Sequence, residues 1–264
     1  MMKALFLGYG SMGKALGEVW LQTNLVTSVS AVAPALPRDA RASLFARIDD
    51  VDTGPFDLIV LAVKPTMARD AIASLPPAWI DAATVLSVAA GVTCSALDND
   101  GRMQIALVRA MPNTPVIVRG GCTGLFANER VGAVQREWIQ RLFEAVGKAV
   151  WLDDEAQIDV VTALSGSGPA YYHLFSEALI DAGIALGLSP ALSQELVTAT
   201  ISGAATLQNE PNANLPSLRQ SVTSPNGTTE AAIRVFEADR KLRSLVADAA
   251  LAAYRRAQEL ARQQ

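Results

Sequence analysis

A short apolar run leads directly into a glycine-rich turn in the stretch Ala4-Leu5-Phe6-Leu7-Gly8-Tyr9-Gly10-Ser11-Met12-Gly13. The run has the length of a buried strand, and the turn opens an amphipathic helical segment over residues 11–22. Glycines at this Gly-x-Gly-x-x-Gly spacing permit a tight turn and let a pyrophosphate approach the backbone at the helix N-terminus. The stretch therefore predicts a dinucleotide-binding loop, with a plain turn between strand and helix as the alternative.

Short apolar runs alternate with amphipathic segments through the first half of the chain. We expect strands at residues 4–7, 28–33, 58–63, 85–89, 105–109 and 120–127, and helices at residues 11–22, 67–74 and 130–146. This alternation indicates the α/β class, with a Rossmann-type, doubly wound parallel sheet. From about residue 150, alanine-rich helical periodicity takes over at residues 158–164, 170–186, 193–207, 229–236 and 241–260. The predicted organisation is a dinucleotide-binding domain, residues 1–152, followed by an all-helical domain, residues 153–264.

Composition narrows the class of protein further. Half of the 264 residues are hydrophobic and 18% are charged, which is typical of a globular protein with a sizeable core. The net charge of −4 argues against a nucleic-acid surface, and a single histidine, His173, argues against a metal cluster. The only two cysteines, Cys94 and Cys122, lack CxxC spacing and are expected to be reduced thiols. No apolar run is long enough for a signal peptide or a membrane span, so we expect a cytoplasmic protein.

The helical half carries small residues at close spacing, in the sets Ala178, Ala182, Ala185 and Ala199, Gly203, Ala204. Such faces let helices approach closely and often mark packing between subunits. Its apolar helices are also too numerous for one small core. We therefore expect a homodimer, with a ring of dimers as a larger alternative.

Three further segments are candidates for contact with a dinucleotide. Residues 32–35 lack the acidic residue that binds the ribose of NAD, whereas Arg38 and Arg41 follow shortly and suit the 2′-phosphate of NADP. An ordinary solvated face is the alternative for these arginines. Residues 62–65 and 89–91 each lie at the carboxyl end of an expected strand, where open α/β sheets bind ligands, and small residues there leave room for a nicotinamide. Lys64 has three possible roles: a phosphate contact, a strand-end charge or catalysis.

Late in the chain, residues 222–229 read Val222-Thr223-Ser224-Pro225-Asn226-Gly227-Thr228-Thr229. This segment combines a tight turn with the start of a helix, and two threonine hydroxyls stand beside the exposed backbone N–H groups. Such a helix start favours an anion. Together with the nucleotide loop, it suggests a reductase that holds a small carboxylate near a nicotinamide.

Read in order, these segments resemble those of the pyrroline-5-carboxylate reductase family. The resemblance runs from residue 4 to about residue 236, and its matching pieces are the glycine-rich loop and residues 61–65, 87–91, 109–115, 163–171 and 222–229. It implies transfer of hydride from NADPH, or NADH, to a cyclic imine to give L-proline, the last step of proline biosynthesis. It also implies a helical domain that interlocks with a partner subunit.

The resemblance assigns roles residue by residue. It implies that the cofactor is held by Gly8, Tyr9, Gly10, Ser11, Met12, Gly13, Ala62, Val63, Lys64, Pro65, Val88, Ala89 and Ala90. The segment at and after the end of the second expected strand adds Ala33 and Arg38 as expected cofactor contacts, independently of the resemblance. It implies that the substrate is received by Ser224, Gly227, Thr228 and Thr229. Thr229 is then closest to the ring nitrogen and is the expected catalytic residue, and no metal is expected.

The chain departs from the family pattern at a few positions, and other functions remain as alternatives. Ser11 and Gly13 stand where the family commonly has asparagine and alanine, and Asn226 stands where it usually has a second glycine. A related imine reductase or β-hydroxyacid dehydrogenase of the same architecture is one alternative, although residues 158–207 contain no lysine to act as its base. An inactive NADP-binding regulatory protein is the other.

Overall fold

The computed structural model describes residues 2–34 and 40–262, which form two compact units. The first unit extends to Ser167 and also includes the end of the chain from Ala252, and the second unit is Gly168–Leu251. Residues 153–167 thus pack with the nucleotide-binding half of the chain. The boundary at residue 152 that the sequence predicts separates two functional domains rather than two compact units. This boundary stays a prediction.

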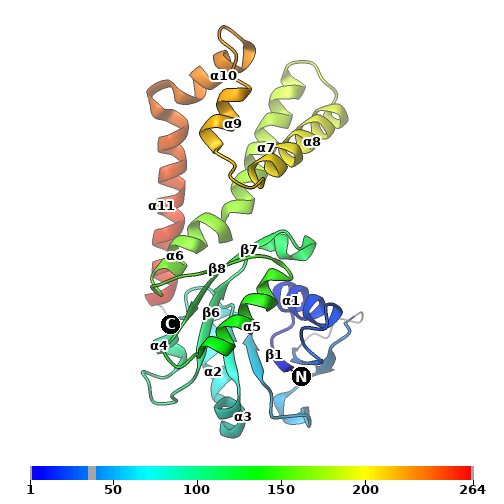
Figure 1. The fold of residues 1–264 in the computed structure, drawn as a ribbon, viewed down its shortest axis with the longest axis vertical. Helices are drawn as coiled ribbons and strands as arrows, with labels where there is room; N and C mark the ends of the chain where they lie inside the picture. Colours follow the sequence, from blue (N-terminus) through cyan, green and yellow to red (C-terminus); the bar gives the residue numbers. More distant parts are fainter. Residues whose placement is uncertain (1, 35–39, 263–264) are drawn as a thin grey trace. The chain divides into compact units, whose positions relative to one another are not determined.

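The first unit is built on an eight-stranded sheet with the order β3-β2-β1-β4-β5-β6-β7-β8 (Figure 1). Neighbouring strands are parallel except β6 and β7, which are antiparallel. The strands are β1 (Lys3–Leu7), β2 (Ser28–Val32), β3 (Ser43–Phe45), β4 (Leu58–Leu61), β5 (Thr84–Ser87), β6 (Leu107–Met111), β7 (Gly121–Ala127) and β8 (Gly147–Trp151). The predicted Rossmann-type sheet is confirmed, and the strand order reverses direction between β1 and β4.

Helices cover both faces of this sheet, because successive residues of each buried strand point to opposite sides. In β1, Phe6 packs on one side with Trp20 of α1 (Ser11–Gln22), while Leu5 packs on the other with Ile72 of α2 (Ala68–Ala73). On the first side, α1 lies with α5 (Ala133–Glu144), and the Trp20 indole donates a hydrogen bond to the Leu142 carbonyl at 2.8 Å. On the second side, α2 is joined by α3 (Pro77–Ala82) and α4 (Cys94–Leu97).

Two strands lie outside the sequence-based expectation. The strand β3 has only three residues, too few for a period to be recognised. The strand β8 lies at the other edge of the sheet, and its residues are alternately half-buried and exposed, so it lacks the apolar run of a central strand. Chain order and composition do not reveal such edge strands, since pairing with a neighbour defines them.

The chain leaves the first unit through α6 (Gln157–Val161) and a short π-helix, Thr162–Gly166. The second unit contains α7 (Gly168–Ala185), α8 (Pro190–Gln208), α9 (Leu215–Ser221), α10 (Thr228–Glu237) and the first part of α11 (Lys241–Arg262). The helix α9 lies between the helices expected at residues 193–207 and 229–236, where the sequence predicts none. It begins there because the Asn214 side chain accepts a hydrogen bond from the Ser217 N–H and caps it.

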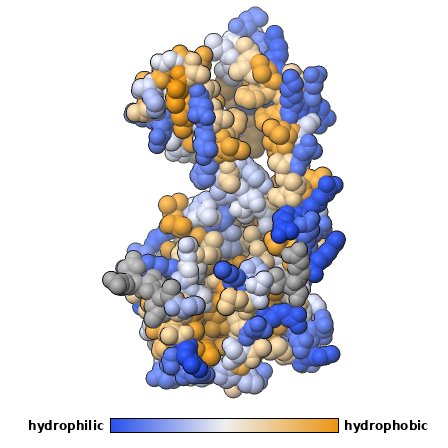
Figure 2. Space-filling model, turned by 180° about the vertical axis from the view of Figure 1, so that it is seen from behind, coloured by the Kyte–Doolittle hydropathy of each residue, from blue (hydrophilic) through white to orange (hydrophobic). Residues whose placement is uncertain are grey.

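The helices α7 and α8 meet closely yet leave most of their surface uncovered. A Cβ atom on Gly183 would lie 2.7 Å from the Ser193 Oγ, so a larger residue there would require the Ser193 side chain to move. Gly168 and Ser193 are their only buried residues, while Tyr172, Leu174 and Leu196 are 63%, 66% and 50% exposed. Figure 2 shows apolar side chains gathered on the surface of this unit. Within the described ranges, no helix combines the length and apolar character that crossing a membrane requires.

Candidate active site

The glycine-rich loop takes the conformation that its motif predicts. Gly8 has φ +91°, and a Cβ atom there would lie 2.5 Å from the carbonyl oxygen of Ala62. A Cβ atom on Gly13 would lie 2.8 Å from the Gly8 carbonyl oxygen. The loop therefore turns tightly against the end of β4, and α1 packs directly beneath it.

The start of α1 is suited to a pyrophosphate. Gly10 is the N-cap residue, and a Cβ atom there would meet nothing within 4 Å, so this position faces open space. The first turn of α1 contains no acidic residue, which leaves the partial positive charge of its N–H groups uncompensated. Ser11 is exposed and Met12 half-buried at this turn.

Tyr9 contributes its backbone to this loop rather than its ring. The ring is 3% exposed, stands edge-on to Phe6 and occupies the space above Gly17. Its hydroxyl donates a hydrogen bond to Glu18 Oε1 at 3.1 Å. Burial, and then the charge of Glu18, raise the pKa of Tyr9 well above its usual value.

The remaining predicted cofactor residues lie at the carboxyl ends of neighbouring parallel strands. Ala33 follows β2, residues 62–65 follow β4, and residues 88–90 follow β5, on either side of the loop after β1. The structure thus brings these segments together at the carboxyl ends of the central strands, where the strand order reverses. Lys64 is exposed there, and Pro65 begins a 3-10 turn. The prediction for Arg38 lies outside the described residues.

The backbone after β2 is fixed by an acidic residue of α1. The Arg41 N–H donates to both carboxylate oxygens of Glu18, at 2.9 and 3.2 Å. Glu18 also accepts the Tyr9 hydroxyl, so its carboxylate is engaged within the protein. The Arg41 side chain is left on the exposed surface beyond Ala33.

The predicted substrate residues form one turn in the second unit, between α9 and α10. The Gly227 N–H donates to the Ser224 carbonyl at 3.0 Å, and Gly227 is the N-cap residue of α10. Asn226 has φ +61°, a left-handed conformation that asparagine tolerates better than most residues. Thr228 and Thr229 occupy the first two helical positions, so their N–H groups have no partner within the helix.

The start of α10 also carries its own carboxylate. Glu230 Oε2 accepts a hydrogen bond from the Asn226 N–H at 2.8 Å and so holds the turn to the helix. The flanking helices are tied by Arg219 of α9, whose guanidinium lies 3.3 Å from Glu237 of α10. The turn is thus held by a backbone hydrogen bond and by the Glu230 carboxylate, while Thr228 remains exposed and Thr229 half-buried.

Sequence reasoning assigned no role to the buried ion pair of Arg109 and Glu155. The Arg109 side chain is 5% exposed and lies 2.9 Å from Glu155 Oε1, which also accepts the Cys94 N–H at 2.7 Å. Burial, and then the charge of Glu155, raise the pKa of Cys94 to about 12. Burial likewise raises the pKa of Asp159 above its usual value. The signal in the sequence is an arginine within the apolar strand β6, because a buried arginine requires an acidic partner.

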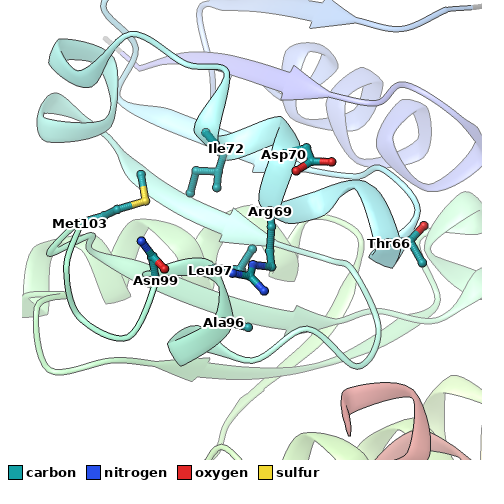
Figure 3. A pocket seen from close by; sticks show the side chains of 9 residues that line it. Thr66, Arg69, Asp70, Ile72, Ala96, Leu97, Asn99 and Met103 are labelled. Carbon is teal, nitrogen blue, oxygen red and sulfur yellow. The ribbon is translucent and has the colours of Figure 1, made fainter. Parts of the chain in front are cut away.

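A hollow of about 420 Å³ lies elsewhere on the first unit, between α2 and the segment around α4 (Figure 3). It is lined by Thr66, Arg69, Asp70, Ile72, Ala73, Ala96, Leu97, Asn99 and Met103. None of the predicted site residues lines it. Among the residues that the structure describes, no group of histidine, cysteine or carboxylate side chains is arranged to hold a metal ion.

The fold and the loop define a dinucleotide-binding protein of the doubly wound class that carries a helical second unit. Comparison with known proteins identifies the family within this class. Residues 155–260 match the family described as pyrroline-5-carboxylate reductase dimerisation, and residues 3–91 match the family described as NADP oxidoreductase, coenzyme F420-dependent.

Full-length relatives agree with these family matches. The chain is 41% identical to a pyrroline-5-carboxylate reductase of Pseudomonas aeruginosa over 98% of this chain and 96% of the relative. The pyrroline-5-carboxylate reductase structure from Coxiella burnetii shares 35% identity with a TM-score of 0.89, over 98% of both chains. The pyrroline carboxylate reductase of Plasmodium falciparum, solved with NADP bound, shares 27% identity with a TM-score of 0.87, also over 98% of both. This chain belongs to the pyrroline-5-carboxylate reductase family.

Proposed function

We propose that this protein reduces L-1-pyrroline-5-carboxylate to L-proline with a hydride from NADPH, the last step of proline biosynthesis. The observation that carries the proposal is full-length similarity to several reductases of this name, at up to 41% identity. The chain also keeps the two features that the reaction needs, a pyrophosphate loop at Gly8–Gly13 and a hydroxyl-lined turn at the start of α10.

The cofactor is NADPH, with NADH as the alternative. Bound NADPH supplies the hydride. The loop Gly8–Gly13 holds the pyrophosphate, and Ala62–Pro65 with Val88–Ala90 line the remainder of the cofactor along the same sheet edge. Residues 32–35, which follow the core of β2, contain no acidic residue to bind a ribose 2′-hydroxyl, and this favours the 2′-phosphate. The nearby Glu18 carboxylate is already engaged by the Arg41 N–H and the Tyr9 hydroxyl. Arg38 and Arg41 supply positive charge in this region.

The substrate carboxylate binds at the turn formed by Ser224, Gly227, Thr228 and Thr229. Its binding partners are the free N–H groups of the first turn of α10 and the adjacent hydroxyls. The Thr229 hydroxyl contacts the ring nitrogen and orients the C=N bond. A protonated imine accepts hydride readily and solvent supplies the proton, so the main task of these residues is to fix distance and angle.

The functional domains are residues 1–152 and 153–264, and the protein works as a homodimer with a ring of dimers as the larger possibility. The exposed apolar faces of α7 and α8 support self-association. The protein acts in the cytoplasm, which agrees with both cysteines, Cys94 and Cys122, being free thiols.

The test is an assay of NADPH oxidation with pyrroline-5-carboxylate, run beside a panel of other cyclic imines and 2-keto acids. We expect kcat/KM to be largest for pyrroline-5-carboxylate and proline to form in equal amount to the NADPH consumed. A larger kcat/KM for another imine would assign a different substrate. No turnover with any of them would support the non-enzymatic alternative.

A further inference from the structure

The loop of residues 88–93, which joins β5 to α4 within the first unit, is tied to the sheet where it begins. The Val88 N–H donates to the Leu61 carbonyl of β4 at 3.1 Å. The Ala89 N–H donates to the Oγ of Ser87, the last residue of β5, at 3.3 Å. The path of the loop as it leaves the strand is therefore set by hydrogen bonds to β4 and β5.

The far end of the same loop is tied by a carboxylate from a distant part of the chain. Thr93 is the N-cap residue of α4, and Cys94 takes the first helical position, where the N–H has no partner within the helix. Glu155 Oε1 accepts this N–H at 2.7 Å. A hydrogen bond to a charged acceptor is about twice as strong as one between neutral groups.

Glu155 is itself held to the sheet by the charge of Arg109. The Arg109 guanidinium donates to the same oxygen, Glu155 Oε1, at 2.9 Å, and Arg109 lies opposite Ser87 in the pairing of β5 with β6. Because the arginine side chain is 5% exposed, separating it from its carboxylate would leave a buried charge unpaired. The two ends of the loop are thus fixed to adjacent strands, one directly and the other through Glu155.

The backbone that carries Glu155 is ordered by its own hydrogen bonds. The N–H groups of Asp153 and Asp154 both donate to Gln157 Oε1, at 3.1 and 3.2 Å. The Glu155 carbonyl accepts the Ile158 N–H at 3.0 Å. The carboxylate is therefore presented from a closed turn between β8 and α6 rather than from a free surface side chain.

We propose that Glu155 is a positioning residue for the cofactor, which acts by fixing the loop of residues 88–93 through the Cys94 N–H. The inference depends on the proposed function, with Val88–Ala90 beside the nicotinamide of NADPH. Hydride transfer is sensitive to the distance and angle of the reacting atoms. Releasing one end of this loop therefore impairs the nicotinamide end of the cofactor and spares the pyrophosphate end, which Gly8–Gly13 holds.

Cys94→Pro removes the donor at the position where a helix tolerates proline best. Proline is favoured at the first helical position, and the preceding residue must be extended, as Thr93 is with φ −78° and ψ 160°. Cys94→Ala shares the loss of the thiol but keeps the N–H. The difference between the two variants therefore measures the hydrogen bond to Glu155.

The chain offers a matched control for proline in Ala133, which is exposed at the first helical position of α5. It follows an extended Gly132, with φ −74° and ψ 172°. The helix α5 follows β7, which is antiparallel to β6, so it starts at the opposite end of the sheet from residues 88–93. Ala133→Pro thus repeats the substitution far from the proposed cofactor.

The experiment uses the full-length protein and measures kcat/KM for NADPH with pyrroline-5-carboxylate as the second substrate. We expect a value about tenfold or more lower in Cys94→Pro than in Cys94→Ala. The Kd for 2′-phospho-ADP-ribose, which lacks the nicotinamide, should agree within about twofold between these two variants. Amide hydrogen exchange, measured without ligand, should be faster at residues 88–93 in Cys94→Pro. Ala133→Pro should keep kcat/KM within about twofold of wild type.

A second substitution tests the same contact from the other side. Glu155→Gln keeps an acceptor and removes the charge, so it should lower kcat/KM for NADPH and spare the Kd for 2′-phospho-ADP-ribose. It replaces Cys94→Pro if that variant fails to fold. Equal kcat/KM in Cys94→Pro and Cys94→Ala, an equally weakened affinity for 2′-phospho-ADP-ribose, or an equal loss of kcat/KM in Ala133→Pro would each overturn the role of Glu155.

Failure of the proposed function has a different signature. In that case the wild-type protein itself does not oxidise NADPH with pyrroline-5-carboxylate. The Kd for NADPH then takes the place of kcat/KM, beside the exchange at residues 88–93. Equal values of both in Cys94→Pro and Cys94→Ala reject Glu155, whereas weaker NADPH binding with faster exchange keeps its role in cofactor binding.

Discussion

Gly8 and Gly10 both belong to the nucleotide loop, but they are glycines for different reasons. Gly8 has φ +91° and no room for a Cβ atom, whereas Gly10 has φ −73° and open space around it. We expect Gly8→Ala to lower the free energy of unfolding by about 1–3 kcal/mol, because the alanine would be held in an unfavourable left-handed conformation. Gly10→Ala should leave the melting temperature unchanged and weaken NADPH binding, since a methyl group would occupy the path of the pyrophosphate.

Thermal unfolding and NADPH titration of the two variants check this contrast. Normal NADPH affinity in Gly10→Ala would place the pyrophosphate away from this loop. A stable Gly8→Ala would show that the backbone can relax there.

Thr229 is the residue on which the proposed chemistry depends most. If its hydroxyl contacts the ring nitrogen of the substrate, Thr229→Val keeps the shape and loses the hydrogen bond, and kcat/KM should fall by about tenfold to a hundredfold. Thr229→Ser should retain most of the activity because it keeps the hydroxyl. Steady-state kinetics with pyrroline-5-carboxylate measure this difference. Equal kcat/KM in Thr229→Val and wild type would exclude a contact between the Thr229 hydroxyl and the ring nitrogen.

At the scale of single elements, the start of α10 combines an attraction and a repulsion for a carboxylate. Its free N–H groups attract an anion, while Glu230 places a negative charge in the same first turn. Glu230→Gln removes the charge and keeps an acceptor for the Asn226 N–H. If the substrate carboxylate binds here, we expect KM for pyrroline-5-carboxylate to fall, by a factor of about two to five at low ionic strength.

The salt dependence of this effect provides its control. The difference in KM between Glu230→Gln and wild type should shrink as salt is added, because surface charges are screened. A KM that is indifferent to the substitution at every salt concentration would place the carboxylate elsewhere.

At the scale of the whole first unit, two buried acidic groups predict its response to alkali. Burial raises the pKa of Tyr9 above its ordinary 10.0 and that of Cys94 from 9.0 to about 12. The folded protein therefore holds these protons more tightly than the unfolded chain does. As the pH rises through about 9–10 the unfolded chain loses them first, and the free energy of unfolding falls.

Urea unfolding between about pH 7.5 and 10.5 measures this fall. Tyr9→Phe keeps the ring against Phe6 and removes one of the two groups, so its stability should decline less steeply with pH. Identical pH profiles for Tyr9→Phe and wild type would contradict the assignment.

The second unit leaves its apolar helix faces uncovered, and this predicts association of whole chains. Leu196 is 50% exposed and lines an apolar hollow of about 410 Å³ between α7 and α8. We expect Leu196→Glu to shift the protein towards monomers in analytical ultracentrifugation, because a charge there cannot be desolvated. Val134→Glu, at an exposed valine of α5, is the matched control and should leave the assembly intact. An undisturbed assembly in both variants would place the interface on another face.

Several elements of the fold could be predicted from local pattern. The helix over residues 11–22 has the predicted bounds, because the glycine-rich turn starts it and its apolar period is regular. The positions of β1, β4 and β5 follow from their apolar runs. The edge strand β8 and the capped helix α9 could not be predicted in this way, since each depends on a neighbour or on a single capping side chain.

The sequence alone determined the class of the sheet, the nucleotide loop and the hydroxyl-bearing turn, because each is encoded by residues that are adjacent in the chain. Only the tertiary structure decided that the Tyr9 ring is buried, that Glu155 neutralises Arg109, and that Glu155 holds the Cys94 N–H. The reason is distance along the chain: Arg109 and Glu155 are 46 residues apart, and Cys94 and Glu155 are 61 apart. Such pairs form only after the sheet has brought their strands and helices together, and no local period records them.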